Sequence, residues 1–174
     1  MFLDETGFKL SPSVEHTWAK RGQTPIIKRS LNRHKFNVIG AVTSSGQFVS
    51  KTHSGYITQK EVAQFLSHVL DWVDGKIIVV WDGARIHNVS NAIAKFLDSN
   101  YGQRIIECIK LPAYAPELNP AELAWRWLKS QGIGNRCPQT LAELKRLWRN
   151  ARKRFKKEVD MLALIRHALP SGIS

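Results

Sequence analysis

The sequence has little cysteine, no long apolar run and a shortage of acids. Cys108 and Cys137 are its two cysteines, and neither belongs to a CxxC pair, so a thiolate zinc site is not expected. No apolar run approaches the ~18 residues of a membrane span. The N-terminus lacks a basic stretch followed by an apolar one, which excludes a typical signal peptide. These absences predict a protein of a reducing, cytoplasmic compartment with no membrane partner.

The shortage of acids leaves a strong positive charge. There are 26 Lys and Arg against 14 Asp and Glu, for a net charge of +12 and an isoelectric point near 10.1. Such an excess favours a polyanionic partner, and nucleic acid is the first candidate. A hydrophobic fraction of 43% with six Trp excludes a disordered chain, and 174 residues are enough for one domain with a core.

Apolar periodicity and turn signals predict alternating strands and helices. A β-hairpin is expected around Ser44-Ser-Gly46, and Thr58 with Glu61 predicts a capping box at the start of an amphipathic helix that ends near Gly75. The nearly all-apolar segment 76–81 predicts a strand buried on both faces. Further strands are expected at 1–8, 36–43, 48–52 and 105–111, and further helices at 91–99, 120–131, 140–157 and 159–169. This order indicates an α/β fold with a mixed sheet flanked by helices.

Three acids stand at strand ends or at a helix start. Asp4 follows Phe2-Leu3, Asp82 follows the apolar segment 77–81, and Glu122 lies in the first turn of a helix that Asn119 caps. Carboxylates delivered in this way can build a magnesium site for phosphoryl chemistry. Each also has a plainer interpretation, since Asp4 and Asp82 precede turn glycines and Glu122 completes a capping-box pattern. Glu117, in the same loop, competes with Glu122 for the third position.

Three blocks carry a family resemblance: Asp4-Glu-Thr-Gly-Phe8, Asp82-Gly-Ala-Arg-Ile-His87 and Tyr114-Ala-Pro-Glu-Leu-Asn-Pro-Ala-Glu122. Together they resemble the signature blocks of DDE-superfamily transposase catalytic domains, in the bacterial insertion-sequence branch related to mariner transposases. The resemblance spans about residues 1–129 and implies a ribonuclease-H-like (retroviral-integrase-like) fold. It implies that Asp4, Asp82 and Glu122, rather than Glu117, are catalytic and hold two Mg²⁺ or Mn²⁺ ions. It also places His87 beside the active site.

The function that this resemblance implies is DNA transposition. Such enzymes cleave DNA at the element ends and then transfer the 3′-hydroxyl strand into target DNA, with duplex DNA bound by a homodimer. We expect a single catalytic domain over 1–174, with a core at 1–131 and basic C-terminal helices at 140–169, in a nucleoid-associated bacterial protein. The helix-turn-helix modules of such transposases are absent from the sequence and are expected upstream or on a separate reading-frame product. Two alternatives remain: a decayed fragment that binds DNA without catalysis, and a related ribonuclease-H-like nuclease.

Two basic clusters are candidate DNA contacts. The first contains Lys28, Arg29, Arg33 and Lys35, and the second contains Arg149, Arg152 and Lys153. Eight of the thirteen residues in 145–157 are Lys or Arg. Cations at this density on one helix repel one another, which favours a phosphate partner over a merely solvated face.

Overall fold

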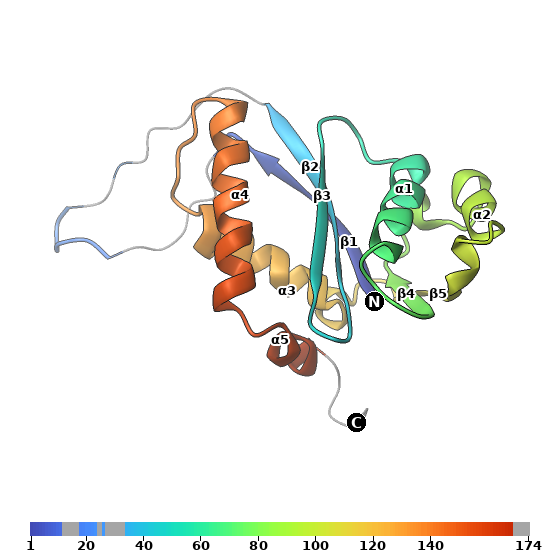
Figure 1. Ribbon diagram of the computed structural model, residues 1–174. Helices are drawn as coiled ribbons and strands as arrows, with labels where there is room; N and C mark the ends of the chain where they lie inside the picture. Colours follow the sequence, from blue (N-terminus) through green and yellow to red (C-terminus); the bar gives the residue numbers. More distant parts are fainter. Residues whose placement is uncertain (12–17, 24–25, 27–33, 169–174) are drawn as a thin grey trace. The chain divides into compact units, whose positions relative to one another are not determined.

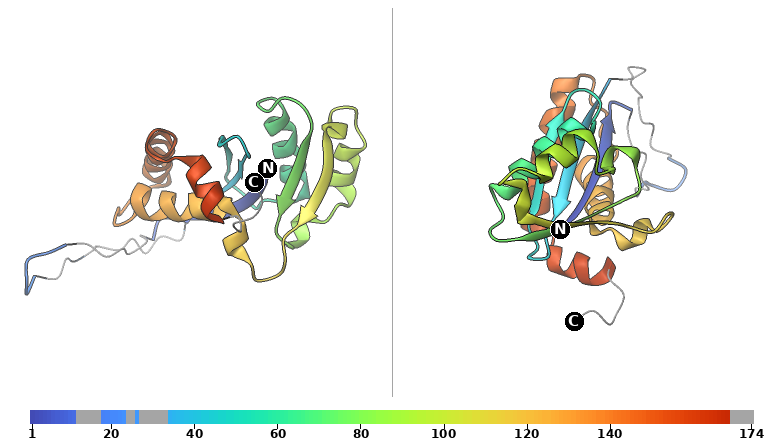
Figure 2. Two further views of the ribbon diagram at one scale, coloured as in Figure 1. Left: turned by 90° about the horizontal axis from the view of Figure 1, so that it is seen from below. Right: turned by 90° about the vertical axis from the view of Figure 1, so that its right-hand side faces the viewer.

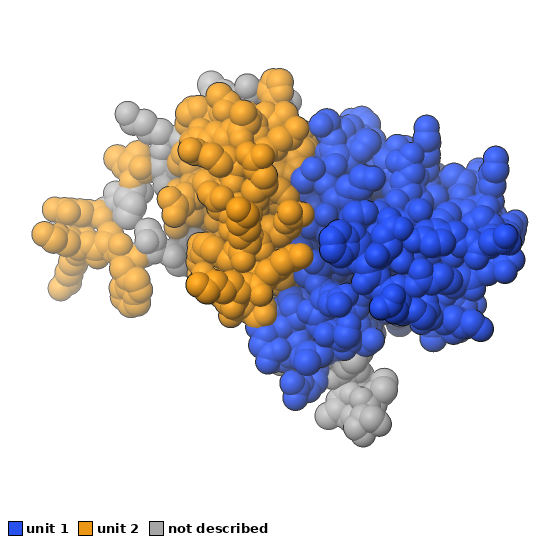
Figure 3. Space-filling view, in the orientation of Figure 1, with its two compact units in different colours: residues 1–6, 37–123, 160–174 blue, residues 7–36, 124–159 orange. Residues whose placement is uncertain are grey.

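The structure is a computed structural model that describes residues 1–11, 18–23, 26 and 34–168. The chain divides into two compact units, which are coloured blue and orange in Figure 3. The first unit contains Met1–Thr6, Asn37–Leu123 and Asp160–Ser174, and the second contains Gly7–Phe36 and Ala124–Val159. The predicted basic residues Lys28, Arg29 and Arg33 lie outside the described residues.

A mixed sheet of five strands has the order β3-β2-β1-β4-β5 (Figure 1). The strands are β1 (Phe2–Lys9), β2 (Lys35–Val42), β3 (Phe48–His53), β4 (Ile77–Trp81) and β5 (Ile105–Lys110). β2 and β3 form the predicted antiparallel hairpin, whereas β4 is parallel to both β1 and β5. The α/β prediction is therefore confirmed. β4 follows β3 and α1 in the chain but lies on the other side of the central strand β1.

The core of the first unit forms where α1 (Gln59–Leu70) packs on the sheet. Thr58 and Glu61 make the predicted capping box, in which the Glu61 carboxylate accepts a hydrogen bond of 2.9 Å from the Thr58 backbone N–H. α1 contacts α2 (Asn91–Leu97), and both lie on the same side of β4 and β5 (Figures 1 and 2). Buried side chains of α1, Phe65 and Leu66 among them, join Val79 and Trp81 of β4 in one apolar cluster.

Arg104 closes the C-terminal end of α1. Its guanidinium donates hydrogen bonds to the backbone carbonyls of Leu70 at 2.8 Å and Gly75 at 3.0 Å, and also to that of Val73. Carbonyls at a helix end have no partner within the helix and carry partial negative charge, so a cation stabilises them. This contact links α1 to the start of β5.

The prediction that β4 is buried on both faces is wrong. Ile78 is 40% exposed, and on β5 Ile106 is 62% and Ile109 40% exposed. Because α1 and α2 cover the same side of these two strands, alternate residues meet the core while the others face away from it. β5 also lies at one edge of the sheet, with no further described strand beside it.

The second unit has its own aromatic core. Phe8 stacks on Phe36 with ring centroids 5.5 Å apart, and Trp148 lies 4.8 Å from Phe8. Trp148 belongs to α4 (Leu141–Glu158), which also buries Leu144, Ala151 and Phe155. α5 (Met161–Ala168) follows α4 in the chain and belongs to the first unit. No helix among the described residues is both long and apolar enough to span a bilayer.

The helix predicted over 120–131 changes form partway. α3 (Pro120–Trp127) is α-helical, and Leu128–Ile133 continues it as a π-helix. Gly132 is required there, since a Cβ at this position would lie 2.7 Å from the Cβ of Ala151 on α4. The glycine that predicts a helix end near position 132 therefore lies inside the π-helix, where it allows α4 to approach closely.

Candidate active site

The three acids singled out from the sequence come from neighbouring elements of the first unit. Asp4 lies on β1, and Asp82 directly follows β4. The parallel register pairs Phe2 with Val80, so two residues further along both strands Asp4 comes beside Asp82. Glu122 lies in the first turn of α3, reached from the end of β5 through the loop 111–119.

These acids line one cavity of about 430 Å³. Its walls come from β1, the residues that follow β4, the loop after β5 and the start of α3. Asp4 lies within β1, which continues to Lys9, and not at a strand end as the sequence predicts. The lining residues are Asp4, Asp82, Gly83, Ala84, Leu111, Pro112, Ala113, Tyr114, Ala115, Pro116, Asn119 and Glu122. No Lys, Arg or His is among the described residues that line this cavity.

Asp4 is the most perturbed of the three acids. It is 7% exposed, and its Oδ2 is buried with no hydrogen-bond partner among the described residues. Burial, helped by the charges of Glu122, Glu5 and Asp82, raises the pKa of Asp4 to about 7, although the hydrogen bond from the backbone N–H of Glu5 acts to lower it. A buried carboxylate with an unsatisfied oxygen is costly unless a proton or a cation accompanies it.

Asp82 is held by two donors. Its Oδ1 accepts a hydrogen bond of 2.9 Å from the Ala84 backbone N–H and lies 2.6 Å from Nδ1 of His87. His87 is fully buried and stacks on Trp81 with ring centroids 5.1 Å apart, while its Nε2 lies 3.0 Å from Glu5 Oε1. His87 therefore bridges two carboxylates and fixes one oxygen of Asp82.

Two opposing effects act on the pKa of His87. Burial disfavours the charged imidazolium and lowers the pKa, but the hydrogen bond to Glu5 and the charges of Glu5 and Asp82 prevail and raise it. A protonated ring donates from both nitrogens, which matches the two carboxylate neighbours. A protonated ring lies between the carboxylates of Glu5 and Asp82 and offsets the charge of both.

Glu122 faces the cavity rather than acting as a helix cap. Asn119 caps α3 alone, since its Oδ1 accepts from the Ala121 N–H at 3.1 Å. The Asn119 backbone N–H, which a capping box would give to Glu122, donates instead to the Pro116 carbonyl at 3.0 Å. Asn119 Nδ2 lies 3.4 Å from the Leu3 carbonyl, which ties the start of α3 to β1. Glu117 is exposed in its 3₁₀ turn and does not line the cavity.

The donor set suits a divalent cation. Three carboxylates, one with an orphaned buried oxygen, are the hard oxygen ligands that Mg²⁺ and Mn²⁺ accept. As they stand, no group of three His, Cys, Asp or Glu in the described part of the chain is arranged to hold a metal ion. Like charges keep such side chains apart, so closer approach requires the cation itself.

Tyr114 stands out in the loop that forms the cavity wall. Its side chain is fully exposed, and its backbone has a φ of 60°, a left-handed conformation that is uncommon for a bulky residue. Strained backbone of this kind costs about 1–3 kcal/mol and is concentrated at ligand sites. The loop holds an aromatic ring at the mouth of the acidic cavity.

The C-terminal basic cluster lies on α4 in the second unit. Arg149 and Lys153 are exposed and Arg152 is half-buried, and α4 buries Trp148, Ala151 and Phe155. Arg149, Arg152 and Lys153 are called the basic face below. Of the other predicted cluster, Lys35 is described, and it is exposed at the start of β2.

Sequence reasoning missed Glu5 as the second partner of His87. The two residues are 82 positions apart, and no local pattern connects them. The alternation of side chains along β1 already indicates that Glu5 points away from Asp4, but it does not identify what lies there.

Comparisons with known proteins bear on the family and the fold of this chain. A family model described as "DDE superfamily endonuclease" matches residues 1–145. The solved structure titled "Crystal structure of the Mos1 Strand Transfer Complex" is 15% identical with a TM-score of 0.69, and covers 96% of this chain and 49% of its own. "Crystal structure of the Mos1 mariner paired end complex with Mn" is 16% identical with a TM-score of 0.68, and covers 96% of this chain and 50% of its own.

The fold is thus ribonuclease-H-like, as in these Mos1 transposase structures, and the chain spans about half the length of the chains it matches. No match is found among curated proteins.

Proposed function

The chain belongs to the DDE superfamily of endonucleases, and on that basis we propose that it is the catalytic domain of a DNA transposase. Its reaction is metal-dependent cleavage of DNA at the element ends, followed by transfer of the freed 3′-hydroxyl strand into target DNA. The observation that carries the proposal is the acidic cavity, which Asp4, Asp82 and Glu122 line and where the buried Oδ2 of Asp4 has no hydrogen-bond partner among the described residues.

Asp4, Asp82 and Glu122 would hold two Mg²⁺ or Mn²⁺ ions. The titles of two Mos1 paired-end complexes name Mn and Mg, which supports the same choice of metals here. Bound divalent cations supply charge neutralisation at the scissile phosphate and make water a better nucleophile at neutral pH. No protein nucleophile is needed.

The chain's own residues prepare the site. His87 and the Ala84 N–H fix Oδ1 of Asp82 and leave its other oxygen toward the cavity. Asn119 holds the start of α3 against β1, and this contact sets the position of Glu122 relative to Asp4. Tyr114 at the mouth provides an exposed ring on which a DNA base can stack.

We propose duplex DNA as the partner, bound in the active complex by a homodimer with helix-turn-helix modules supplied by another part of the protein or another chain. The Mos1 transposase structures that this chain resembles include a complex with a transposon end and a strand transfer complex, which supports this choice. The basic face on α4 would contact phosphates, which fix position without reading sequence.

Calorimetric titration with Mn²⁺ tests the acidic site with a matched pair of variants. Glu122→Gln should lose most of the binding, whereas Glu117→Gln, the same chemical change in the same loop, should bind as the wild type does. Asp82→Asn should also bind weakly. Mn²⁺-dependent nicking of supercoiled plasmid should follow the same order. Equal Mn²⁺ affinity in the wild type and Asp82→Asn would refute the site, and loss of binding in Glu117→Gln alone would assign the third acid to Glu117.

A further inference from the structure

The second unit contains a cavity that the proposed reaction does not use. It has a volume of about 330 Å³, at the lower end of the ~300–1,000 Å³ typical of ligand pockets. Three chain segments line it: the end of β1 and the residues after it, the π-helix with the turn that follows, and the start of α4. The lining residues are Gly7, Phe8, Lys9, Ser11, Lys129, Ile133, Arg136, Pro138 and Leu144, and this set is called the basic pocket below.

The floor of the basic pocket is apolar and rigid. Phe8, Ile133, Pro138 and Leu144 are all buried. The Phe8 ring is fixed by its stacking on Phe36 and by Trp148. A flat ring can bind to a pre-formed floor of this kind without the loss of conformational entropy that ordering its side chains would cost.

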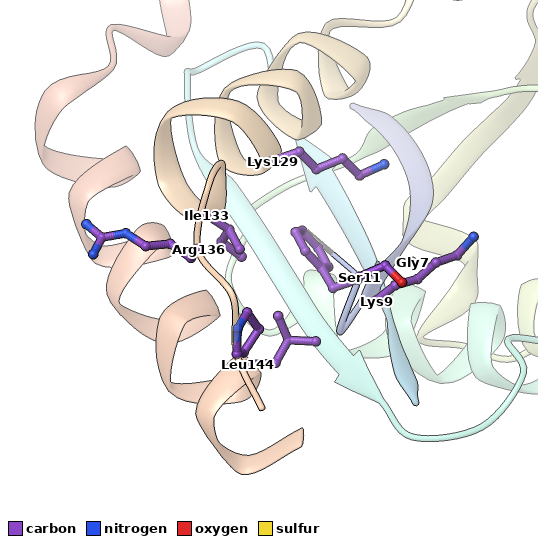
Figure 4. A pocket seen from close by; sticks show the side chains of 9 residues that line it. Gly7, Lys9, Ser11, Lys129, Ile133, Arg136 and Leu144 are labelled. Carbon is purple, nitrogen blue, oxygen red and sulfur yellow. The ribbon is translucent and has the colours of Figure 1, made fainter. Parts of the chain in front are cut away.

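Among the residues that the structure describes, the rim carries three cations and no acid. Lys9 and Arg136 are exposed and Lys129 is half-buried. In the described part of the chain none of the three forms an ion pair, whereas Arg154 on α4 pairs with Glu158 at 3.1 Å. Figure 4 shows Lys9 and Lys129 extending to one side of the pocket and Arg136 to the other. An extended anion that crosses the pocket would meet positive charge at both edges.

We propose that the basic pocket binds an unpaired nucleotide of a DNA strand, with its base on the apolar floor and its flanking phosphates at the cationic rim. An apolar cavity alone would suit any uncharged ligand, and surface cations alone would suit any anion. A ring-sized apolar floor between separated cations matches a nucleobase between two phosphates, as in proteins that bind single strands. A base inside a duplex is stacked and cannot enter, so the pocket selects for unpaired DNA.

This inference rests on the proposed function only in naming DNA as the strand. The basic pocket contains none of the three acids. DNA binding to the pocket can therefore be measured in a chelating buffer, where the acidic site has no divalent cation to bind. If the pocket fails this test while metal-dependent cleavage persists, the proposed function stands. If cleavage fails while the pocket binds, the proposed function is refuted and the pocket remains.

The test compares two labelled DNAs by fluorescence anisotropy in a chelating buffer: a duplex with one unpaired thymine and the same duplex fully paired. The wild type should bind the unpaired form on the order of tenfold more tightly, given the usual contribution of one stacked base. Ser11→Phe fills the pocket without changing charge or removing a core side chain. This variant should lose the preference and keep its dependence on salt.

The rim is tested by charge removal. Lys9→Gln with Lys129→Gln should flatten the plot of log K against log salt by about 1.4–1.8, at about 0.7–0.9 per phosphate contact. Lys60→Gln with Lys95→Gln removes the same charge from exposed sites on α1 and α2 and should change the slope less.

Any of four results overturns the proposal. Three of them are equal binding of both duplexes by the wild type, a preference that persists in Ser11→Phe, and the same slope in the two double variants. The fourth is displacement of the DNA by polyglutamate at equal charge, because the rim would then be a general anion site.

Discussion

Replacing Asp4 with Asn should stabilise the protein at neutral and alkaline pH when no divalent cation is present. The pKa of Asp4 rises from 3.8 to about 7, first through burial and then through the charge of Glu122. Between these values the folded protein keeps the proton while the unfolded chain releases it. The folded state then binds more protons, so its stability falls as pH rises through this window. Asn keeps the shape of the side chain and cannot ionise.

The magnitude follows from the width of the window. Each pH unit within it is worth about 1.36 kcal/mol, so between pH 5 and pH 7 the wild type should lose about 2–3 kcal/mol relative to Asp4→Asn. For a chain of this length that corresponds to roughly 4–12 °C in Tm. The advantage of the variant should level off above pH 7, where Asp4 is ionised in both states of the wild type.

Urea unfolding at pH 5, 6, 7 and 8 in a chelating buffer measures the effect directly. Asp74→Asn provides the control, because it makes the same chemical change at an exposed position and should follow the wild type. Adding Mg²⁺ at pH 8 should then stabilise the wild type more than Asp4→Asn, because a cation that binds only the folded state contributes free energy to it. Parallel pH dependence of the wild type and Asp4→Asn would refute the reasoning, since it would mean that Asp4 ionises as easily in the fold as outside it.

Three further outcomes are expected. Neutralising the basic face with Gln should flatten the salt dependence of duplex DNA binding by about 2–3 in log–log slope without changing Mn²⁺ binding, and an unchanged slope would make α4 an ordinary solvated helix. Gly132→Ala should cost about 1–3 kcal/mol in urea unfolding, because its Cβ would meet that of Ala151 at 2.7 Å; a neutral result would mean that the π-helix yields freely. Arg104→Ala should cost about 2–4 kcal/mol by leaving the carbonyls of Leu70, Val73 and Gly75, at and just after the end of α1, without this donor, with partial recovery in Arg104→Lys, and a loss below about 0.5 kcal/mol would contradict that role.

Local chemistry in the sequence predicts the elements of this fold well. Thr58 and Glu61 lie three residues apart, so their capping box needs no knowledge of the rest of the chain. The hairpin at Ser44-Ser-Gly46 is equally local, and Gly46 has the positive φ, +80°, that such a turn requires. Burial of β4 was not predictable in this way, because the exposure of Ile78 depends on which side of the sheet the helices cover.

The candidate site likewise contains residues that local sequence predicts and contacts that it does not predict. Strand ends and a helix start indicated Asp4, Asp82 and Glu122, and all three line one cavity. The hydrogen bond between His87 and Glu5 joins residues 82 positions apart in the sequence. The apolar floor of the basic pocket joins residues that are still further apart, such as Phe8 and Leu144. The order of the strands and the packing of the helices bring such pairs together. Neither the strand order nor the helix packing can be predicted from a short stretch of sequence.

The pairing of β1 with β4 has a consequence for how the molecule acquires its shape. The Met1 carbonyl accepts from the Val80 N–H at 2.8 Å, so the chain must close a loop of nearly its first 80 residues before these strands meet. Loops of that length form late and slow folding, whereas the hairpin of β2 with β3 and the turns of α1 need only near neighbours. The cavity between Asp4 and Asp82 therefore comes into existence only when β1 takes its place in the sheet. A partly folded chain carries all three acids and has no site, so a signal from a bound Mn²⁺ ion would report the last step of folding.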